Sequence, residues 1–425
     1  MKLERLKGTR EYLPEEQIVR ERIIEVLKEK FKIYGFKPIE TSILDFYKIA
    51  ASKYAGSEII NEIYKLKDRG NRELALRYEL TFKLAKLIGL NPNLKMPFKR
   101  YEIGKVFRDG PVKKGRLREF TQCDIDAVGI KSRAVDAEII ALAFDIFNAL
   151  KLDVFVYVNS IKILFGIFDY CEISKNAFND VALSIDKLEK FGKEYVIKEL
   201  KEKRVKQESI EKLFEIFEKL DGKNNEGKIK LLEALGNKLL KEGLSEIKEF
   251  FKFLKRFGIK KDVLFLPSLA RGLSYYTGLI WEFYLRDSEI KSSVAAGGRW
   301  DNLISKFLET AREYPAVGMS FGLDVIFEAL KEKVSSALPK VLIIPINTLE
   351  ESIKIATKIR KSKISCDIAY EKSLRKALDY ANKEKIKYCL IVGKKELSEG
   401  KVKLRDMEKG TEIVESLDKV IKYLK

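Results

Sequence analysis

Histidine is missing altogether from this chain of 425 residues. Imidazole is the one side chain that ordinarily changes charge between about pH 5 and 8, and it is the commonest metal ligand in proteins. Its absence excludes Ser-His-Asp and Cys-His nucleophiles, imidazole proton transfer and metal sites that depend on histidine. Any catalysis must therefore use arginine, lysine, carboxylates, hydroxyls, backbone groups or a metal held by oxygen ligands.

Cysteine is scarce and long apolar runs are absent. The four cysteines, Cys123, Cys171, Cys366 and Cys389, are far apart and include no C-x-x-C pair, so their spacing supports neither a zinc site nor a disulfide framework. We expect reduced, buried thiols. No segment reaches the length of a membrane span, and the charged N-terminus MKLERLKGTREYLPEEQ is unlike a signal peptide. These features predict a soluble, cytoplasmic protein with no membrane partner.

The glycine-rich phosphate loops are also missing. No G-x-G-x-x-G occurs. The nearest approach to a Walker A loop runs from Gly393 to Lys401, but six residues separate its glycines and Val402 stands where Ser or Thr must reach magnesium. A nucleotide site, if present, is not of these helix-N-terminus types.

Basic charge and aromatic residues are abundant. The chain has 83 Lys and Arg against 64 Asp and Glu, a net charge of +19 that attracts polyanions, nucleic acid first among them. Solvated lysine-rich helices would explain the same charge without a partner. The 25 Phe and 18 Tyr supply apolar surface for a large core, so disorder is disfavoured.

The pattern along the chain divides it into segments. Pro14 opens an apolar helical repeat that ends at Gly35, and the following stretch to Leu44 is strand-like. Residues 165–258 are rich in Lys and Glu with helical periodicity, which predicts a helical insertion. After a linker, residues 338–425 alternate strand and helix patterns, which is typical of a separate α/β domain.

Two segments carry chemistry-bearing residues, and each has an ordinary structural explanation as well. A basic hairpin with Arg108, Arg116 and Phe120 can hold a triphosphate and stack on a purine, but any charged hairpin has this composition. The segment RGLSYYTG begins at Arg271. If it forms a strand, Tyr275 and Tyr276 point to opposite faces and at most one lines a given pocket.

Together the motifs resemble those of the histidyl-tRNA synthetases, which are class II aminoacyl-tRNA synthetases. RGLSYYTG resembles the family's R-G-L-D-Y-Y-T-G, LRYELT its L-R-P-E-x-T, and FRDGPVKKGRLREFTQCDIDAVG its motif 2. AAGGRWDNL is similar to the G-G-R-Y-D segment, AVGMSFGLDVI to motif 3, and YCLIVGKKELSEGKVKLRDMEKGTE to the class IIa anticodon-binding domain. Only the helical insertion lacks a matching motif.

The resemblance implies a fold and an activity. The fold would be α/β (α+β), with an antiparallel-sheet catalytic domain formed by residues 1–164 and 259–334, interrupted by the insertion at 165–258, and an anticodon-binding domain at 338–425. The activity would be ATP-dependent ligation of L-histidine to tRNA(His) through histidyl-adenylate, with Mg²⁺, in a cytoplasmic homodimer. The alternative is a non-catalytic relative that regulates another enzyme or only binds tRNA.

The family's residue roles extend to matching positions. For ATP, Arg108 would hold the α-phosphate, Arg116 the outer phosphates, and Phe120 the adenine. For histidine, the α-amino group and carboxylate would be bound by one set of side chains and the imidazole by another. The first set is Glu79, Thr81, Gln122 and Arg271, and the second is Asp126 and Tyr276, with Tyr275 beside the pocket. Arg271 would also stabilise the α-phosphate.

Four positions depart from the family pattern. Ser42 replaces the motif 1 proline, which weakens the inference of a dimer, and Ser274 replaces an aspartate. Asp126 is one methylene shorter than the usual glutamate. Val325 stands where motif 3 has its ATP-binding arginine, and we expect Arg299 to supply the missing cation. Loss of one such donor typically reduces the rate about 100- to 1000-fold.

Overall fold

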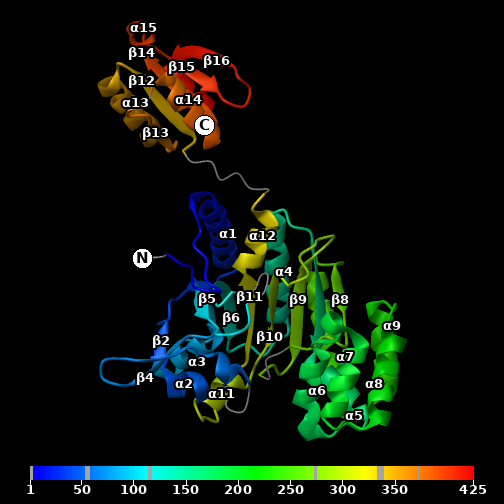
Figure 1. Cartoon of the computed structure of the whole chain (residues 1–425). Coiled ribbons are helices and arrows are strands. Elements are labelled where there is room, and N and C mark those ends of the chain that lie inside the picture. The colour runs from blue at the N-terminus through cyan, green and yellow to red at the C-terminus, as the bar shows by residue number, and fades with distance from the viewer. Residues whose placement is uncertain (1–2, 53–57, 113–116, 272–274, 333–338, 372) are drawn as a thin grey trace. The chain divides into compact units, whose positions relative to one another are not determined.

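A computed structural model describes all residues except 1–2, 53–57, 113–116, 272–274, 333–338 and 372 (Figure 1). Its contacts divide the chain into two compact units. The larger consists of residues 1–11 and 20–331, and the smaller of residues 12–19 and 332–425. The linker predicted around 335–339 lies largely outside the described residues.

The main sheet of the larger unit has eight strands among the described residues, in the order β1-β5-β6-β11-β10-β9-β7-β8. Neighbouring strands are antiparallel except for the parallel pairs at the two ends, β1 with β5 and β7 with β8. The strands are β1 (Lys37–Pro38), β5 (Phe98–Phe107), β6 (Glu119–Val128), β7 (Val154–Ser160), β8 (Val263–Phe265), β9 (Leu279–Leu285), β10 (Ala295–Arg299) and β11 (Ala316–Gly322).

The two faces of this sheet differ in polarity. Three helices cover the apolar face: α1 (Pro14–Ile33), α4 (Ala134–Ala149) and α12 (Leu323–Leu330). On that face Phe321 of β11 packs between Phe31 of α1 and Phe147 of α4. Alternate strand residues point to the other side, and there the side chains of β5 and β6 are largely charged. Charged residues are rarely buried without partners, so this second face indicates a functional site.

The N-terminal helix forms as predicted, but the strand expected after it is much shorter. Helix α1 begins at Pro14, and Gly35 adopts a left-handed φ of 78° just beyond its end. The extended stretch to Leu44 contributes only β1 to the main sheet, because Pro38 lacks the N–H that a longer ladder needs. Strand β2 (Leu44–Phe46) instead joins a small sheet with β4 (Glu73–Leu76) and β3 (Lys65–Lys67).

Short elements frame the edge of the polar face. Helix α3 (Thr81–Leu90) follows the small sheet and packs against α11 (Leu303–Phe307). Nearby lie α2 (Tyr47–Ser52) and the 3-10 helix η1 (Glu58–Glu62). These connections bring the LRYELT segment to the ends of β5 and β6 that border the hairpin loop.

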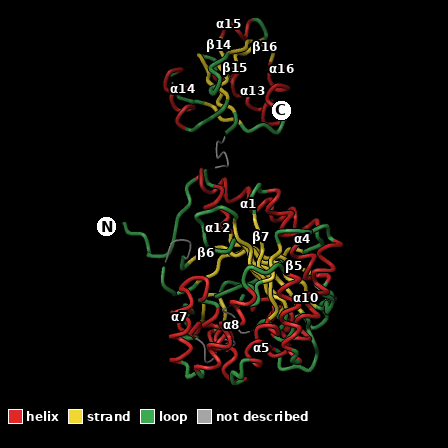
Figure 2. The backbone as a smooth tube through the Cα atoms, turned by 90° about the vertical axis from the view of Figure 1, so that its right-hand side faces the viewer, coloured by secondary structure: helices red, strands yellow, loops and turns green. Residues whose placement is uncertain are grey.

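The region predicted as an insertion consists of helices joined by short turns. Its elements are α5 (Ile161–Tyr170), η2 (Lys175–Ala177), α6 (Phe178–Ile185), α7 (Leu188–Glu202), α8 (Gln207–Leu220), α9 (Asn225–Leu235) and α10 (Lys238–Arg256). Figure 2 shows these helices gathered beside the sheet. Glu246 of α10 accepts hydrogen bonds from Arg133 at 2.5 Å and from Lys162 at 2.8 Å. These bonds connect α10 to the segment before α4 and to the first turn of α5.

The smaller unit is an α/β domain built on a five-stranded sheet, in the order β13-β12-β14-β15-β16. Strand β12 is parallel to β13 and β14, whereas β15 and β16 are antiparallel to their neighbours. Its elements are β12 (Val341–Ile346), α13 (Leu349–Lys361), β13 (Cys366–Ile368), α14 (Leu374–Lys383), β14 (Tyr388–Gly393), α15 (Lys394–Ser398), β15 (Lys401–Asp406), β16 (Glu412–Ser416) and α16 (Leu417–Leu424).

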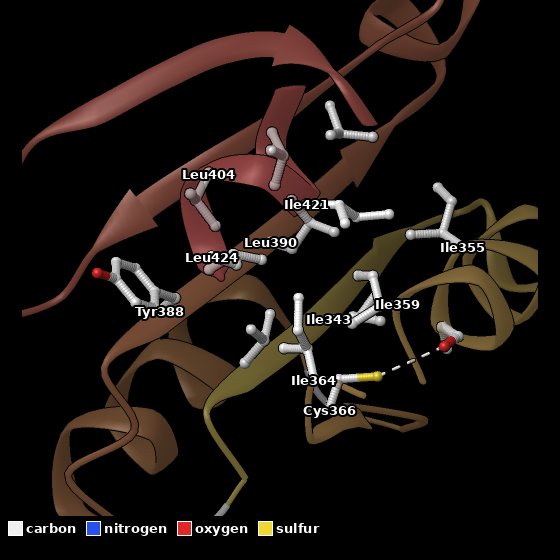
Figure 3. Packing of buried hydrophobic residues seen from close by; sticks show 14 of the residues in the cluster. Ile343, Ile355, Ile359, Ile364, Cys366, Tyr388, Leu390, Leu404, Ile421 and Leu424 are labelled. Carbon is white, nitrogen blue, oxygen red and sulfur yellow. Dashed lines mark hydrogen bonds between the residues drawn. The ribbon is translucent and has the colours of Figure 1, made fainter. Parts of the chain in front are cut away.

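An apolar core lies on each face of the smaller sheet. Figure 3 shows the core between the sheet, α13 and α16, in which Ile343, Leu390 and Ile421 meet. The opposite face packs against Ala377 and Ala381 of α14. All four cysteines of the chain are buried and unbridged, as expected. Among the described residues, no helix is long and apolar enough to cross a membrane.

Candidate active site

A cavity of about 380 Å³ opens on the polar face of the main sheet. Strands β6, β10 and β11 form its floor, and the loops around Glu79 and Tyr276 contribute to its walls. Most of the site residues predicted from the motifs line this cavity. They are Glu79, Thr81, Arg108, Gln122, Asp126, Arg271, Tyr275 and Tyr276.

Strand β6 provides three polar side chains at alternate positions, Gln122, Asp124 and Asp126, which therefore point into the cavity together. Within the described part of the chain, Gln122 Oε1 and Asp124 Oδ1 are buried without a hydrogen-bond partner. Leaving a buried acceptor unsatisfied costs about 1–3 kcal/mol. The site is thus prepared for a ligand rich in N–H groups.

The carboxyl groups of β6 have raised pKa values. Burial raises the pKa of Asp124 to about 6 and that of Asp126 to about 8, and the positive charge of Arg100 opposes both shifts. Arg100 lies on β5 with its Nη2 atom 2.6 Å from Asp126 Oδ2. A cationic or N–H-donating ligand would favour the ionised forms of these carboxyls.

Arg271 projects from the loop after β8 and is held by an acidic side chain of β9. Its Nη1 atom lies 2.7 Å from Glu282 Oε1, and the hydroxyl of Tyr284 donates to the same carboxylate. Burial opposes the charge of Arg271, but Tyr276 and Glu282 raise its pKa above the ordinary value. Arg271 therefore presents a permanent, oriented positive charge to the cavity.

Arg108 stands at the end of β5, where the hairpin loop begins. Its guanidinium carbon lies 4.4 Å from the centre of the Tyr78 ring and 4.9 Å from that of Phe120. Its Nε atom donates to the Tyr78 carbonyl oxygen at 3.4 Å. Phe120 contacts Arg108 without itself lining the cavity. An arginine beside an aromatic ring is suited to a nucleotide, because phosphate and base can be bound together.

Tyr275 and Tyr276 both line the cavity, which contradicts the expectation that at most one could do so. That expectation assumed a strand, but the described residues of this segment lie in a turn before β9. The two rings are 4.7 Å apart and tilted by 45°. Ser274 and Arg116 lie outside the described residues.

Arg299 lies on β10, but its side chain faces α4 on the helix-covered side of the sheet. Its guanidinium is fully buried, forms an ion pair with Asp136, and donates through Nε to Asp136 Oδ1 at 3.1 Å. It also donates to Asp301 Oδ1 at 3.1 Å and to the carbonyl oxygens of Ile130 and Ser132 at 2.9 and 3.2 Å. This position does not fit the ATP-binding role expected for Arg299, because no N–H group is left to reach the cavity.

Several lining residues were not predicted from the sequence. Asp124 could have been found, since it is two residues before Asp126 in a strand and must share its face. Tyr78 lies within the LRYELT motif beside Glu79. Glu62 comes from η1, and no sequence pattern links it to the site. In the described residues, no group of three or more His, Cys, Asp or Glu side chains could hold a metal ion.

Comparison with known proteins gives consistent matches over the whole chain. A family model described as histidyl-tRNA synthetase matches residues 8–326, and one described as anticodon binding domain matches residues 340–425. Histidine–tRNA ligase 1 of Bacillus cereus is 43% identical over 434 residues, covering 100% of both chains. Histidine–tRNA ligase 2 of Shouchella clausii is 41% identical over 413 residues, covering 96% of both.

A solved structure agrees with these sequence matches. Histidyl-tRNA synthetase from Nostoc sp. superposes with a TM-score of 0.87 at 28% identity, covering 100% of this chain and 99% of that one. The resemblance read from the motifs is thus confirmed, as is the predicted fold class, with its mostly antiparallel main sheet and C-terminal α/β domain. The chain therefore belongs to the histidyl-tRNA synthetase family.

Proposed function

We propose that this protein ligates L-histidine to tRNA(His) in two steps. First, the histidine carboxylate attacks the α-phosphorus of ATP, giving histidyl-adenylate and pyrophosphate. A terminal ribose hydroxyl of the tRNA then attacks the carbonyl carbon, and AMP leaves. The observation that carries this proposal is one cavity that combines two arginines, Arg108 and Arg271, with the buried polar side chains of β6.

The chemistry agrees with the absence of histidine. The attacking carboxylate is already ionised, so the first step needs no general base. Positioning of the reactants and neutralisation of phosphate charge supply the catalysis. Arg108 and Arg271 would stabilise the α-phosphate, Arg116 the outer phosphates, and Phe120 would stack on adenine. Mg²⁺ would enter with ATP, since this ion usually binds substrate phosphates together with one or two carboxylates.

The amino acid would occupy the part of the cavity nearest β6. Glu79, Thr81 and Gln122 would bind the α-amino group. Asp126 would accept a hydrogen bond from one imidazole nitrogen, and the Tyr276 hydroxyl would donate to the other, with Tyr275 beside them. A pocket of this kind rejects analogues that cannot pair with its buried polar groups.

The direct test is ATP–pyrophosphate exchange. Purified, folded protein is expected to exchange pyrophosphate into ATP only when L-histidine is present. Asp126→Asn should raise KM for L-histidine more than it raises KM for ATP. Folded protein without exchange activity would refute the proposal and favour the non-catalytic alternative.

The exchange reaction should depend on pH through Asp126. Because burial raises its pKa to about 8, against the effect of Arg100, the accepting carboxylate becomes the major form only above that pH. Free imidazole also loses its charge near about pH 6.5. We expect kcat/KM for L-histidine to rise from about pH 6 to about pH 8, whereas Asp126→Asn should lack the upper part of this rise. A profile that is flat in wild-type protein would contradict the assignment.

Binding of tRNA should weaken as salt rises. The chain carries a net charge of +19, and a protein that neutralises phosphates releases counterions from the nucleic acid. We propose that the domain at 338–425 contacts the anticodon and the catalytic domain the acceptor end. Affinity for tRNA(His), measured by filter binding, is expected to fall at least about tenfold between about 50 and 200 mM salt. Affinity that is independent of salt would show that the basic charge serves another purpose.

The assembly and the location are part of the same proposal. We propose a cytoplasmic homodimer, as the family resemblance implies. Ser42, which replaces the motif 1 proline, donates to the Leu44 carbonyl oxygen at 3.0 Å and accepts from Lys83 Nζ at 3.1 Å, and these bonds support the local turn. Sedimentation equilibrium should give twice the mass of one chain.

A further inference from the structure

Arg100 is a buried arginine whose side chain meets a cavity residue without lining the cavity itself. It is completely inaccessible to solvent and lies on β5 directly opposite Asp126 of β6. Its Nη2 atom is 2.6 Å from Asp126 Oδ2 and 3.4 Å from the Leu80 carbonyl oxygen. Its Nη1 atom is 3.7 Å from Glu102 Oε2. Arg100 therefore contacts Asp126 from the neighbouring strand. Of these two residues, only Asp126 lines the cavity.

The strand on the other side of β6 leaves space for the same carboxyl group. Gly318 of β11 is directly opposite Asp126. A Cβ atom at this glycine would lie 1.9 Å from Asp126 Oδ1 and 2.8 Å from its Cγ. Any larger residue would push the carboxyl group away. One oxygen of Asp126 thus lies over Gly318 and the other against Arg100, so the two neighbouring strands (Figure 1) together set its direction.

Charge reinforces this geometry. The neighbouring carboxyl groups of Asp124, Glu79 and Glu102 all disfavour a negative charge on Asp126, and Arg100 is the cation that offsets them. The groups around Asp126 come from every adjoining element: Arg100 and Glu102 of β5, Asp124 of β6, Glu79 before α3, Arg271 and Tyr276 of the loop before β9, and the uncharged Gly318 and Ser320 of β11. Without Arg100, three carboxyl groups would surround Asp126 with no directly paired cation.

We propose that Arg100 is a positioning residue for the recognition of histidine: it fixes the direction of Asp126 and favours its ionised form, which then accepts a hydrogen bond from the imidazole. This proposal rests on the proposed function, in which Asp126 binds the imidazole. Arg100 touches neither substrate. Its contribution should therefore appear in the binding of L-histidine and leave the binding of ATP unchanged.

The test compares Arg100→Met with wild type in ATP–pyrophosphate exchange. Misdirection of a binding group typically reduces reaction efficiency by about 10- to 100-fold, so KM for L-histidine should rise by that factor, while KM for ATP should stay within about twofold. Because an opposite charge near a carboxyl group lowers its pKa, the rise of kcat/KM for L-histidine should move to higher pH by at least about one unit.

Arg20→Met is the matched control. Arg20 of α1 is also a buried arginine, but its ion pair, at 2.6 Å, is with Asp324 of α12 on the helix-covered side of the sheet, and neither residue lines the cavity. Its loss should change thermal stability and leave both the KM for L-histidine and the pH profile unchanged. A second variant, Arg100→Lys, keeps the charge but loses the planar guanidinium. It should raise KM for L-histidine less than Arg100→Met does and leave the pH profile in place.

The outcomes separate this proposal from the proposed function. Wild-type protein without histidine-dependent exchange would refute the function itself. Active wild type, with Arg100→Met and Arg100→Lys both leaving KM for L-histidine unchanged or raising it no more than KM for ATP, would overturn the positioning role. If Arg100→Met does not fold, Arg100→Lys decides alone: an unchanged KM for L-histidine overturns the proposal, and a selective rise supports it.

Discussion

Replacement of Arg271 by glutamine is expected to lower kcat for ATP–pyrophosphate exchange by about 100- to 1000-fold, the usual cost of removing one preorganised donor from a charged transition state. When the carboxylate attacks the α-phosphorus, the negative charge on the surrounding oxygens must be stabilised. Arg271 is held at the cavity by Glu282 at 2.7 Å, so the reaction need not reorient it. Glutamine keeps a hydrogen-bond donor but removes the charge, and single-turnover formation of the adenylate measures the effect on this step.

Arg286→Gln is the control for that experiment. Arg286 follows β9, pairs with Asp262 at 2.6 Å and is about as accessible as a surface arginine, with 40% of its side chain exposed. Its replacement should leave kcat within about twofold of wild type, because exposed ion pairs contribute little. A loss of less than about fivefold in Arg271→Gln, in protein with an unchanged melting temperature, would show that another group neutralises the phosphate.

The resemblance of short motifs to those of a known family made much of the candidate site predictable. Glu79, Gln122 and Arg271 stand in short motifs that can be recognised in one sequence. The hairpin of β5 and β6 was predicted from its two strand patterns. Each of these inferences needs only residues that are close in sequence. The fold class followed from the same motifs, because their order along the chain is that of a known family.

The remaining features depend on which strands become neighbours. Arg100 and Asp126 are 26 positions apart, and only the register between β5 and β6 makes them a pair. The partner of Arg299 is on a helix, α4, that packs on the face opposite the cavity. A sequence shows that an arginine is present but not which side of the sheet it faces. This is why Arg299 was expected to bind ATP although its side chain faces α4.

Arg299 was expected to supply the cation that is missing at Val325. Its side chain faces α4 and pairs with Asp136 instead. Val325 lies in the first turn of α12 and is only partly buried. Among the described lining residues, the arginines that we propose for phosphate binding are Arg108 and Arg271. With Val325 in the place of the motif 3 arginine, we expect stacking on Phe120 to carry more of the affinity for ATP.

The buried ion pair of Arg299 with Asp136 leads to a second prediction with a large expected effect, this time on stability. Arg299→Met is expected to lower the free energy of unfolding by about 3–5 kcal/mol, because it leaves the carboxylate of Asp136 buried without its partner. Burial raises the pKa of Asp136, and Arg299 opposes that shift, so the loss of the arginine should raise this pKa further. The fall in stability as pH rises through the range in which Asp136 ionises should then be larger than in wild type. Urea unfolding at two pH values measures both effects.

A double variant distinguishes a structural ion pair from an ATP ligand. Arg299→Met with Asp136→Leu removes both charges, so it should recover much of the stability lost by Arg299→Met alone. In folded protein, below the melting temperature, both variants should keep a KM for ATP within about twofold of wild type, because the guanidinium bonds Asp136, Asp301 and two backbone carbonyl groups on the helix-covered side of the sheet. If Arg299→Met instead raised KM for ATP at least about tenfold with little loss of stability, the side chain would have to turn toward the cavity when ATP binds. The ion pair with Asp136 would then be a resting position of an ATP-binding residue.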